Sequence, residues 1–269
     1  MEYHQRSPIG NSIILENFSR YYRFPNSFEQ MVYLSQVQQA TAIKTAVEWW
    51  RSLTPNCLGS IIWQLNDIWP GPSWSSIEYS GKWKLLHYAI KKFYEPIYLS
   101  LFIKDKKIHA FVCNDTIRSL EGKLTVKFLK FDGTEYAKEV EVEVKIDADE
   151  TKEVYTEDVV DKDKTEYFVY AELKGTDSKD EKFVRDGTVF PGIYKHCELA
   201  NCKIANYIAK NDNVFEITIK SDLPAFYVSF DTVGIKGKFS ENMFTLLPNK
   251  SKKVYYYPAE KYDMAVFKT

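Results

Sequence analysis

The pattern of apolar and polar residues changes from a helical period to an alternating one about a third of the way along the chain. Between Phe28 and Leu53, apolar side chains recur every three or four residues, which is the spacing of an amphipathic helix. Ser27, followed by Gln30 three positions later, forms a capping box at the start of this segment. Pro55 and Asn56 follow its end, so we expect a helix over residues 28–53 that covers a sheet or a barrel.

A second helix is predicted from about Trp83 to Phe93, because it carries an apolar stripe and is followed by Pro96. Residues 1–26 are predicted to be irregular, with room for a short helix between Ile13 and Tyr22.

The segment between these two helices, Leu58–Trp74, reads LGSIIWQLNDIWPGPSW. Its first part, Leu58–Leu65, is apolar and β-branched, and predicts a buried strand. Aromatic rings, amide groups and a carboxylate follow, and then a Pro/Gly turn. This arrangement predicts a pocket at the C-terminal end of the strand, which is the end where β/α barrels bind their ligands. Helix, strand, loop and helix make one and a half β/α units, whereas a barrel needs eight.

The side chains of this segment are the candidate ligand-binding residues. Sugars suit such a lining, because their C–H faces stack on indole rings and their hydroxyls need amides and carboxylates. The alternative is that Trp63 only fills a core and that Asn66 and Asp67 only cap the turn. The density of tryptophans with polar groups between them favours a ligand surface. The candidates are Trp63, Gln64, Asn66, Asp67, Trp69 and Trp74; the last two either line the rim or pack the loop against the next domain.

From Ile97 onward the period of the pattern is two. Val140, Val142 and Val144 alternate with charged residues, as in a sheet with one wet face and one dry face. Six strands within about 90 residues predict an immunoglobulin-like β-sandwich. These strands are expected at residues 98–103, 107–113, 123–131, 139–146, 151–155 and 166–174. The charged runs 158–164 and 176–182 are expected to be solvated loops.

A second all-β block begins near Cys197 and is compatible with a terminal sandwich. Its predicted strands cover residues 203–210, 214–220, 225–230 and 252–257.

Composition removes several classes of function. Thirty-six basic and 37 acidic side chains nearly balance, which argues against a nucleic-acid partner. No apolar run approaches the ~20 residues needed to span a bilayer, so no membrane partner is expected. The first six residues lack the apolar region of a signal peptide. The four cysteines and four histidines fall in no metal or nucleophile motif, so neither a metal nor a cofactor is expected. A bridge between Cys197 and Cys202 remains open.

The run Leu58–Trp74 resembles the last barrel strand and following loop of β-mannosidases in glycoside hydrolase family 2. The helix with VYLSQVQQA (Val32–Ala40) and the run SWSSIEYSGKWKLLHY (Ser73–Tyr88) are similar to the elements on either side of that strand. Near the C-terminus, GKFSENMF (Gly237–Phe244) is similar to a GRFSDN-x-F stretch of the family. The resemblance is strong over residues 28–96 and weak across 97–230.

The resemblance implies a multidomain fold of α/β and all-β parts. Residues 1–96 would be the C-terminal remnant of a (β/α)8 TIM barrel, and residues 97–190 and 191–269 two immunoglobulin-like sandwiches. Trp63 matches the aromatic platform beneath the sugar in the −1 subsite. Gln64, Asn66 and Asp67 match polar positions of the same motif, with pocket-shaping or loop-fixing roles. The two catalytic glutamates of the family lie on earlier barrel strands. The S-E-[FY]-G-like motif of the nucleophile is not found in this chain, so no catalytic residue is assigned.

We therefore expect a C-terminal fragment of a β-mannosidase-like glycoside hydrolase, whose parent hydrolyses terminal β-mannosides with retention. Retention requires two carboxylates ~5–5.5 Å apart, so the fragment alone should be inactive. One alternative is a carbohydrate-binding or docking module without hydrolase activity, and another is a truncated paralogue that completes its barrel with a partner chain. Expected partners are a β-mannoside or other carbohydrate and the remainder of the barrel. Exposed barrel faces also predict self-association, or disorder over part of residues 1–56. The compartment of the parent stays open between lysosomal, secreted and cytoplasmic.

Overall fold

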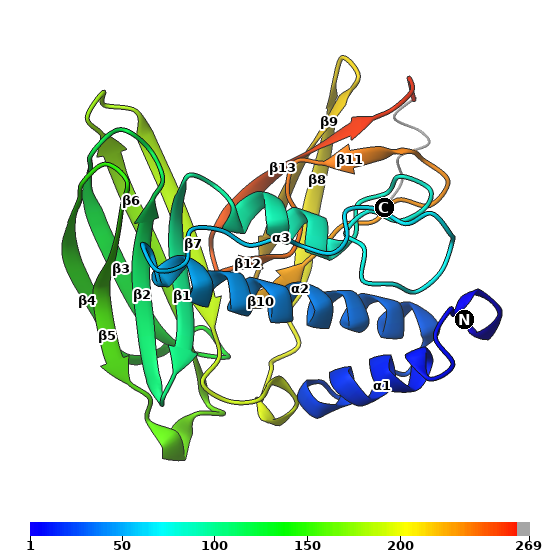
Figure 1. The fold of residues 1–269 in the computed structure, drawn as a ribbon, viewed down its shortest axis with the longest axis horizontal. Coiled ribbons are helices and arrows are strands. Elements are labelled where there is room, and N and C mark those ends of the chain that lie inside the picture. Colours follow the sequence, from blue (N-terminus) through cyan, green and yellow to red (C-terminus); the bar gives the residue numbers. More distant parts are fainter. Residues whose placement is uncertain (263–269) are drawn as a thin grey trace.

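The computed structural model describes residues 1–262, in which a helical N-terminal part adjoins two β-sandwiches (Figure 1). Three α-helices lie in the N-terminal part: α1 (Gly10–Tyr21), α2 (Phe28–Ser52) and α3 (Leu85–Phe93). Short 3-10 turns occupy Glu2–His4, Asp161–Asp163 and Tyr194–His196. The last seven residues of the predicted domain 191–269 lie outside the described residues.

Helix α2 confirms the long helix predicted from the sequence. The Ser27 hydroxyl accepts a hydrogen bond from the Gln30 amide at 3.2 Å, and the Gln30 side chain accepts one from the Asn26 amide at 2.9 Å. Its apolar face packs against α1 and α3 in a shared core. The buried members of that core include Phe18, Val37, Ala40, Val47, Leu86 and Phe93.

The predicted strand Leu58–Leu65 is wrong, because this segment has no strand structure. Only its C-terminal end pairs with a neighbour, through a short parallel bridge between Asn66 and Ile77. Ile61, expected in a core, is 97% exposed. An apolar run indicates a tendency to be buried, but a strand also needs neighbours on its edges to satisfy its backbone groups.

The first sandwich confirms the predicted immunoglobulin-like architecture. One antiparallel sheet has the order β1 (Ile97–Lys104), β2 (Lys107–Asn114), β5 (Glu150–Asp158). The facing sheet has the order β4 (Glu135–Ile146), β3 (Leu120–Lys130), β6 (Tyr167–Asp177), β7 (Lys182–Val189). Their inner faces form one core that includes Leu99, Leu101, Val112, Leu124, Val126 and Val169.

Strand β7 was not predicted. Lys182, Arg185 and Asp186 interrupt its apolar pattern, so the sequence resembles a loop. Its edge position, paired only with β6 in its sheet, explains why so many polar residues are tolerated.

The second all-β block also forms two sheets. One has the order β11 (Gly237–Phe239), β13 (Ser251–Pro258), β9 (Val214–Ser221), β8 (Ile204–Asn211), and the other pairs β10 (Ala225–Val228) with β12 (Phe244–Leu246). The three-residue strands β11 and β12 are too short to give a periodic signal and were missed. Tyr88 of α3 is buried in the core of this block, and its hydroxyl accepts a hydrogen bond from the Phe239 amide at 3.2 Å.

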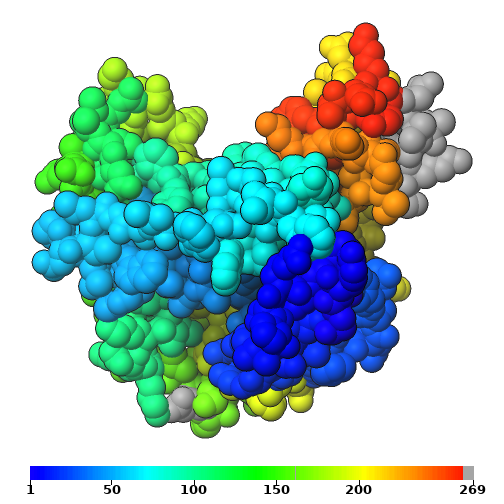
Figure 2. Space-filling model, turned by 45° about the vertical axis from the view of Figure 1, so that its right-hand side comes forward, coloured from blue at the N-terminus to red at the C-terminus, as the bar shows by residue number. Residues whose placement is uncertain are grey.

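The helical part therefore contacts both sandwiches. Figure 2 shows the segment around α3, in cyan, between the green first sandwich and the orange and red strands of the second. At the end of α2, Arg51 donates to the Phe93 carbonyl at 2.5 Å and to the Asp115 carboxylate at 2.7 Å. Helix α3 is linked to β7 by an ion pair of 2.8 Å between Lys92 and Asp186.

All four cysteines are free thiols, so Cys197 and Cys202 are not bridged. Among residues 1–262, no helix is long and apolar enough to cross a membrane.

Candidate functional site

The carboxylate of Asp67 is the centre of a polar cluster on the loop between residue 58 and α3. Ser73 Oγ donates to Asp67 Oδ1 at 2.5 Å, and Ser75 Oγ donates to Oδ2 at 2.5 Å. Lys84, the residue that precedes α3, contacts Oδ2 through Nζ at 3.0 Å. Its ammonium also donates to Ser75 Oγ at 2.8 Å. The cluster joins the start of the loop, its middle and the helix that follows.

The environment of Asp67 favours its charged form. Burial by itself raises the pKa of this carboxyl, but the hydrogen bonds from Ser73, Ser75 and Lys84, with the charge of Lys84, outweigh it and hold the pKa below the ordinary value. A carboxyl that donates a proton in catalysis needs a raised pKa. Asp67 is therefore suited to fixing the loop and not to acting as an acid.

Backbone hydrogen bonds close the same loop. The Ile77 amide donates to the Leu65 carbonyl at 2.8 Å, and the Asp67 amide donates to the Ile77 carbonyl at 3.0 Å. The Ser76 amide donates to the Gln64 carbonyl at 3.1 Å. Residues 64–67 are thus tied to residues 76–77, and the loop between them projects from a fixed base.

A second hydrogen-bonded chain links the Leu65 carbonyl, Ser76 and His87. Ser76 Oγ donates to the Leu65 carbonyl at 2.9 Å and lies 3.0 Å from His87 Nδ1. Because the single hydroxyl proton is directed to the carbonyl, the ring must donate through Nδ1–H. Burial lowers the pKa of His87, which favours this neutral form.

The two indoles at the ends of the loop face solvent. Trp63 is 71% exposed and Trp74 is 63% exposed. The peptide bond between Trp63 and Gln64 is cis. Gln39 of α2 donates to the Trp74 carbonyl at 2.9 Å, so the far end of the loop is also held. Large aromatic faces held by a rigid backbone can stack against an apolar or sugar surface at little cost in conformational entropy.

The other predicted site residues lie in different surroundings. Trp69 packs on the N-terminal segment: its Nε1 donates to the His4 carbonyl at 3.1 Å, and the Arg6 guanidinium lies 3.7 Å from its ring centroid. The Asn66 side chain donates to the adjacent carbonyl of Asp67 at 3.3 Å. The side chain of Gln64 is half-buried.

Three residues of the Asp67 cluster, Ser73, Ser75 and Lys84, were not predicted, and neither was the neighbouring His87. A signal was present, because the two serines alternate with Trp74 in a segment without an apolar period. Their link to Lys84 depends on how the loop folds back onto α3, which spacing alone does not indicate. Among the described residues, no group of three or more His, Cys, Asp or Glu side chains could hold a metal ion.

Comparison with known proteins gives consistent matches over almost the whole chain. Residues 106–196 match the family of the Mannosidase Ig/CBM-like domain, and residues 199–268 match the family of the Ig-fold domain Ig_mannosidase. The chain is 30% identical to a β-mannosidase of Capra hircus, with 93% of this chain and 30% of that protein covered. It is 27% identical to β-mannosidase A of Emericella nidulans, again over 93% of this chain and over 29% of that protein.

Solved structures agree. The β-D-mannosidase of Dictyoglomus thermophilum superposes with a TM-score of 0.85 at 26% identity, covering 97% of this chain and 32% of that one. An exo-chitosanase of Amycolatopsis orientalis shares the fold, with a TM-score of 0.68 at 17% identity over 91% of this chain and 34% of that one. The chain spans about a third of the length of the proteins it matches.

Proposed function

Because this chain corresponds to the C-terminal part of glycoside hydrolase family 2 β-mannosidases, we propose that it supplies one wall of the sugar pocket in a retaining β-mannoside hydrolase. The similarity covers 93% of the chain, including the helical part as well as the sandwiches. It therefore favours this function over an isolated carbohydrate-binding module, which would account for the sandwiches alone.

In this proposal residues 1–96 are the C-terminal portion of a TIM barrel. The order of α2, the segment 58–74 and α3 supports it, because helix, extended segment, loop and helix repeat the order of a β/α unit. The segment 58–65 would become a strand only when the preceding barrel strands lie beside it. Residues 97–190 and 191–269 are then the two sandwiches that follow the barrel.

The observation that carries the proposed site is the pair of exposed indoles on a fixed loop. Trp63 would be the platform on which a mannose ring stacks, with Gln64 and Asn66 at its side. Asp67 holds the loop through Ser73, Ser75 and Lys84. Trp74 would extend the aromatic surface. Trp69 would support the loop through its contacts with the N-terminal segment.

The chain should not hydrolyse β-mannosides alone. The Asp67 cluster contains one carboxylate, whereas retention needs a nucleophile and an acid/base ~5–5.5 Å apart. The family's catalytic glutamates would come from earlier barrel strands. Hydrolysis of an aryl β-mannoside by this chain alone would overturn this assignment of roles.

Titration of mannose and manno-oligosaccharides against tryptophan fluorescence tests the sugar surface. A single stacked ring should give weak binding, with a Kd on the order of 1 mM. Trp63→Ala should abolish the fluorescence change. Trp50→Ala is the matched control, because Trp50 is 41% exposed at the far end of α2, and this variant should titrate like the wild type. Equal titration curves for the wild type and Trp63→Ala would contradict the platform role.

A further inference from the structure

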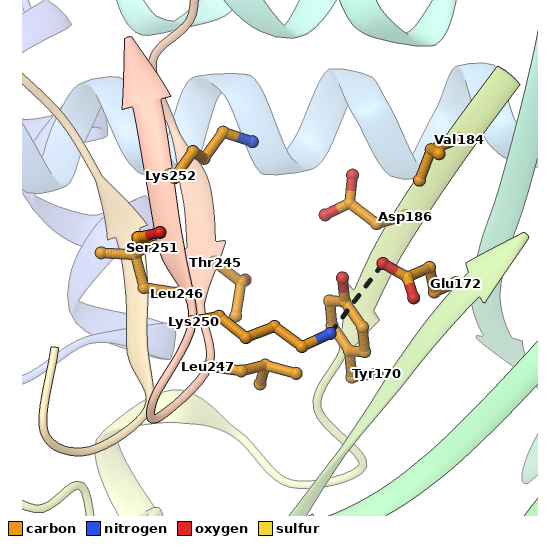
Figure 3. Close-up of a pocket in the computed structure, with 10 residues that line it drawn as sticks. All are labelled: Tyr170, Glu172, Val184, Asp186, Thr245, Leu246, Leu247, Lys250, Ser251 and Lys252. Carbon is orange, nitrogen blue, oxygen red and sulfur yellow. Dashed lines mark ion pairs between the residues drawn. The ribbon is translucent and has the colours of Figure 1, made fainter. Parts of the chain in front are cut away.

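A cleft of about 210 Å³ separates the two sandwiches (Figure 3). One wall comes from β6 and β7 of the first sandwich, with Tyr170, Glu172 and Asp186. The other comes from β12, β13 and their connection, with Thr245, Lys250 and Lys252. It lies outside the loop that carries Trp63, and none of the sequence motifs points to it.

The charges in the cleft balance. Lys250 and Lys252 line one wall, and Glu172 and Asp186 line the other. Each of these four side chains forms an ion pair. Asp186 pairs with Lys92 at 2.8 Å, and Lys252 pairs with Glu241 at 2.7 Å. Since the walls present two positive and two negative groups, neither a free anion nor a free cation is favoured.

One of the contacts between the walls is loose. Lys250 Nζ lies 4.0 Å from Glu172 Oε2, as the dashed line in Figure 3 shows, and its side chain is half exposed. Glu172 has a closer partner in Lys174, at 2.5 Å. Because this contact is long and its lysine is half exposed, a ligand could replace the contact between Lys250 and Glu172 at little cost.

The cleft also has an apolar side. The ammonium of Lys250 lies 6.0 Å from the ring centroid of Tyr170, which places it over the ring. Val184, Leu246 and Leu247 lie beside it. Burial, with the nearby carboxylates of Asp186 and Glu172, raises the pKa of Tyr170, so its hydroxyl stays protonated and can donate.

We propose that this cleft binds one neutral sugar ring, as a second carbohydrate site separate from the Trp63 surface. Each sugar hydroxyl both donates and accepts, so it fits walls that alternate ammonium, carboxylate and hydroxyl groups. The C–H face of the ring fits the apolar side of the cleft, where Val184 is 53% exposed. Pockets for drug-sized ligands have volumes of about 300–1,000 Å³. The volume of this cleft is smaller, so the occupant is limited to about one ring.

Nuclear magnetic resonance of the ¹⁵N-labelled chain titrated with D-mannose tests this proposal. The amides of Tyr170, Thr245 and Ser251 should shift and saturate at millimolar mannose. Lys250→Ala and, separately, Glu172→Gln should each weaken this binding about tenfold, as expected when a hydrogen bond to a charged group is lost. Lys253→Ala is the control, because Lys253 on β13 is 59% exposed, close to the 52% of Lys250, and pairs with Glu216 outside the cleft.

The two sugar sites have separate readouts. Trp63→Ala should leave the cleft shifts unchanged, and Lys250→Ala should leave the tryptophan fluorescence titration unchanged. Absence of cleft shifts at mannose concentrations that saturate the fluorescence would overturn the second site only. Cleft shifts with inorganic phosphate but not with mannose would also overturn it, because the cleft would then be an anion site.

Discussion

At the scale of single residues, the main result concerns Asp67. Its position beside aromatic and amide groups in the sequence is compatible with a pocket acid, yet its three hydrogen-bond partners fix the loop instead. A buried carboxylate with this many donors is costly to alter, because each donor would lose its acceptor.

Asp67→Asn should destabilise the chain by about 1–3 kcal/mol. The amide keeps the shape of the side chain but turns an NH2 group toward Ser75 or Lys84, which also donate. Urea denaturation measures the loss. Asp115→Asn is the control, because Asp115 is the exposed partner in its ion pair with Arg51 and should change stability by less than about 1 kcal/mol. Equal stabilities of the two variants would contradict the anchoring role.

The pH dependence follows from the sign of the same pKa shift. The folded-state pKa of Asp67 lies below its ordinary value of 3.8, so its charged form is favoured by folding. Its contribution to stability is present above that value and is lost as the pH falls through the folded-state pKa. The stability gap between the wild type and Asp67→Asn should therefore be constant between about pH 5 and 7 and should close in acid. A gap that widens in acid would mean that the shift has the opposite sign.

At the scale of elements, helix α2 connects the site to the first sandwich. Glu48 is buried at the contact with β1, where it accepts from the Tyr98 hydroxyl at 2.8 Å, from Lys44 at 2.7 Å and from the Leu101 amide at 3.4 Å. A buried carboxylate held by three donors from two elements specifies how the helix sits on the sheet.

Glu48→Ala should cost about 3–5 kcal/mol, because it leaves the Tyr98 hydroxyl and a backbone amide buried without their acceptor. Thermal or chemical unfolding measures the loss. Glu16→Ala in α1, which removes an exposed pair with Arg20, should change stability by less than about 0.5 kcal/mol. A loss of under 1 kcal/mol in Glu48→Ala would show that the junction does not depend on this carboxylate.

The elements that the sequence predicted correctly are those whose signal is local. Helix α2 has its cap and its apolar stripe, and β4 alternates Val140, Val142 and Val144 with exposed glutamates, as the structure confirms. The errors occur where the outcome depends on distant partners. The segment 58–65 is apolar but has no strands beside it, and β7 is polar but is held by β6.

The candidate site, like the fold, was predicted only in part. Trp63 and Trp74 could be singled out, because aromatic residues among amides are conspicuous in any sequence. The cluster around Asp67 could not be, since Lys84 reaches it only after the chain has folded back over 17 positions. The cleft between the sandwiches depends on how two domains pack, which no local pattern indicates.

At the scale of the whole molecule, an exposed apolar surface remains on the helical part. Leu58, Ile61, Leu65 and Ile68 are each more than half exposed. Helices α1 and α2 occupy most of residues 1–56, so the alternative expectation of disorder there does not match the structure. Self-association through this surface stays a prediction.

Ile61→Glu should reduce concentration-dependent self-association, because a charge cannot be buried in an apolar contact without a partner. Sedimentation velocity across a concentration series measures the effect. Ile117→Glu is the matched control, since Ile117 is 94% exposed on a loop of the first sandwich, and it should associate like the wild type. A wild type that stays monomeric at high concentration would contradict the prediction.

The length of helix α2 has a consequence for which changes the chain can accept. Gln39 donates to the loop that carries Trp74, Glu48 accepts from β1 of the first sandwich, and Arg51 donates to the end of α3. In an α-helix each residue advances the chain by about 1.5 Å and turns it by about 100°. Inserting or deleting one residue between Gln39 and Glu48 would therefore point one of these contacts away from its target. Natural variants should keep the number of residues in this stretch fixed, even where its exposed side chains differ.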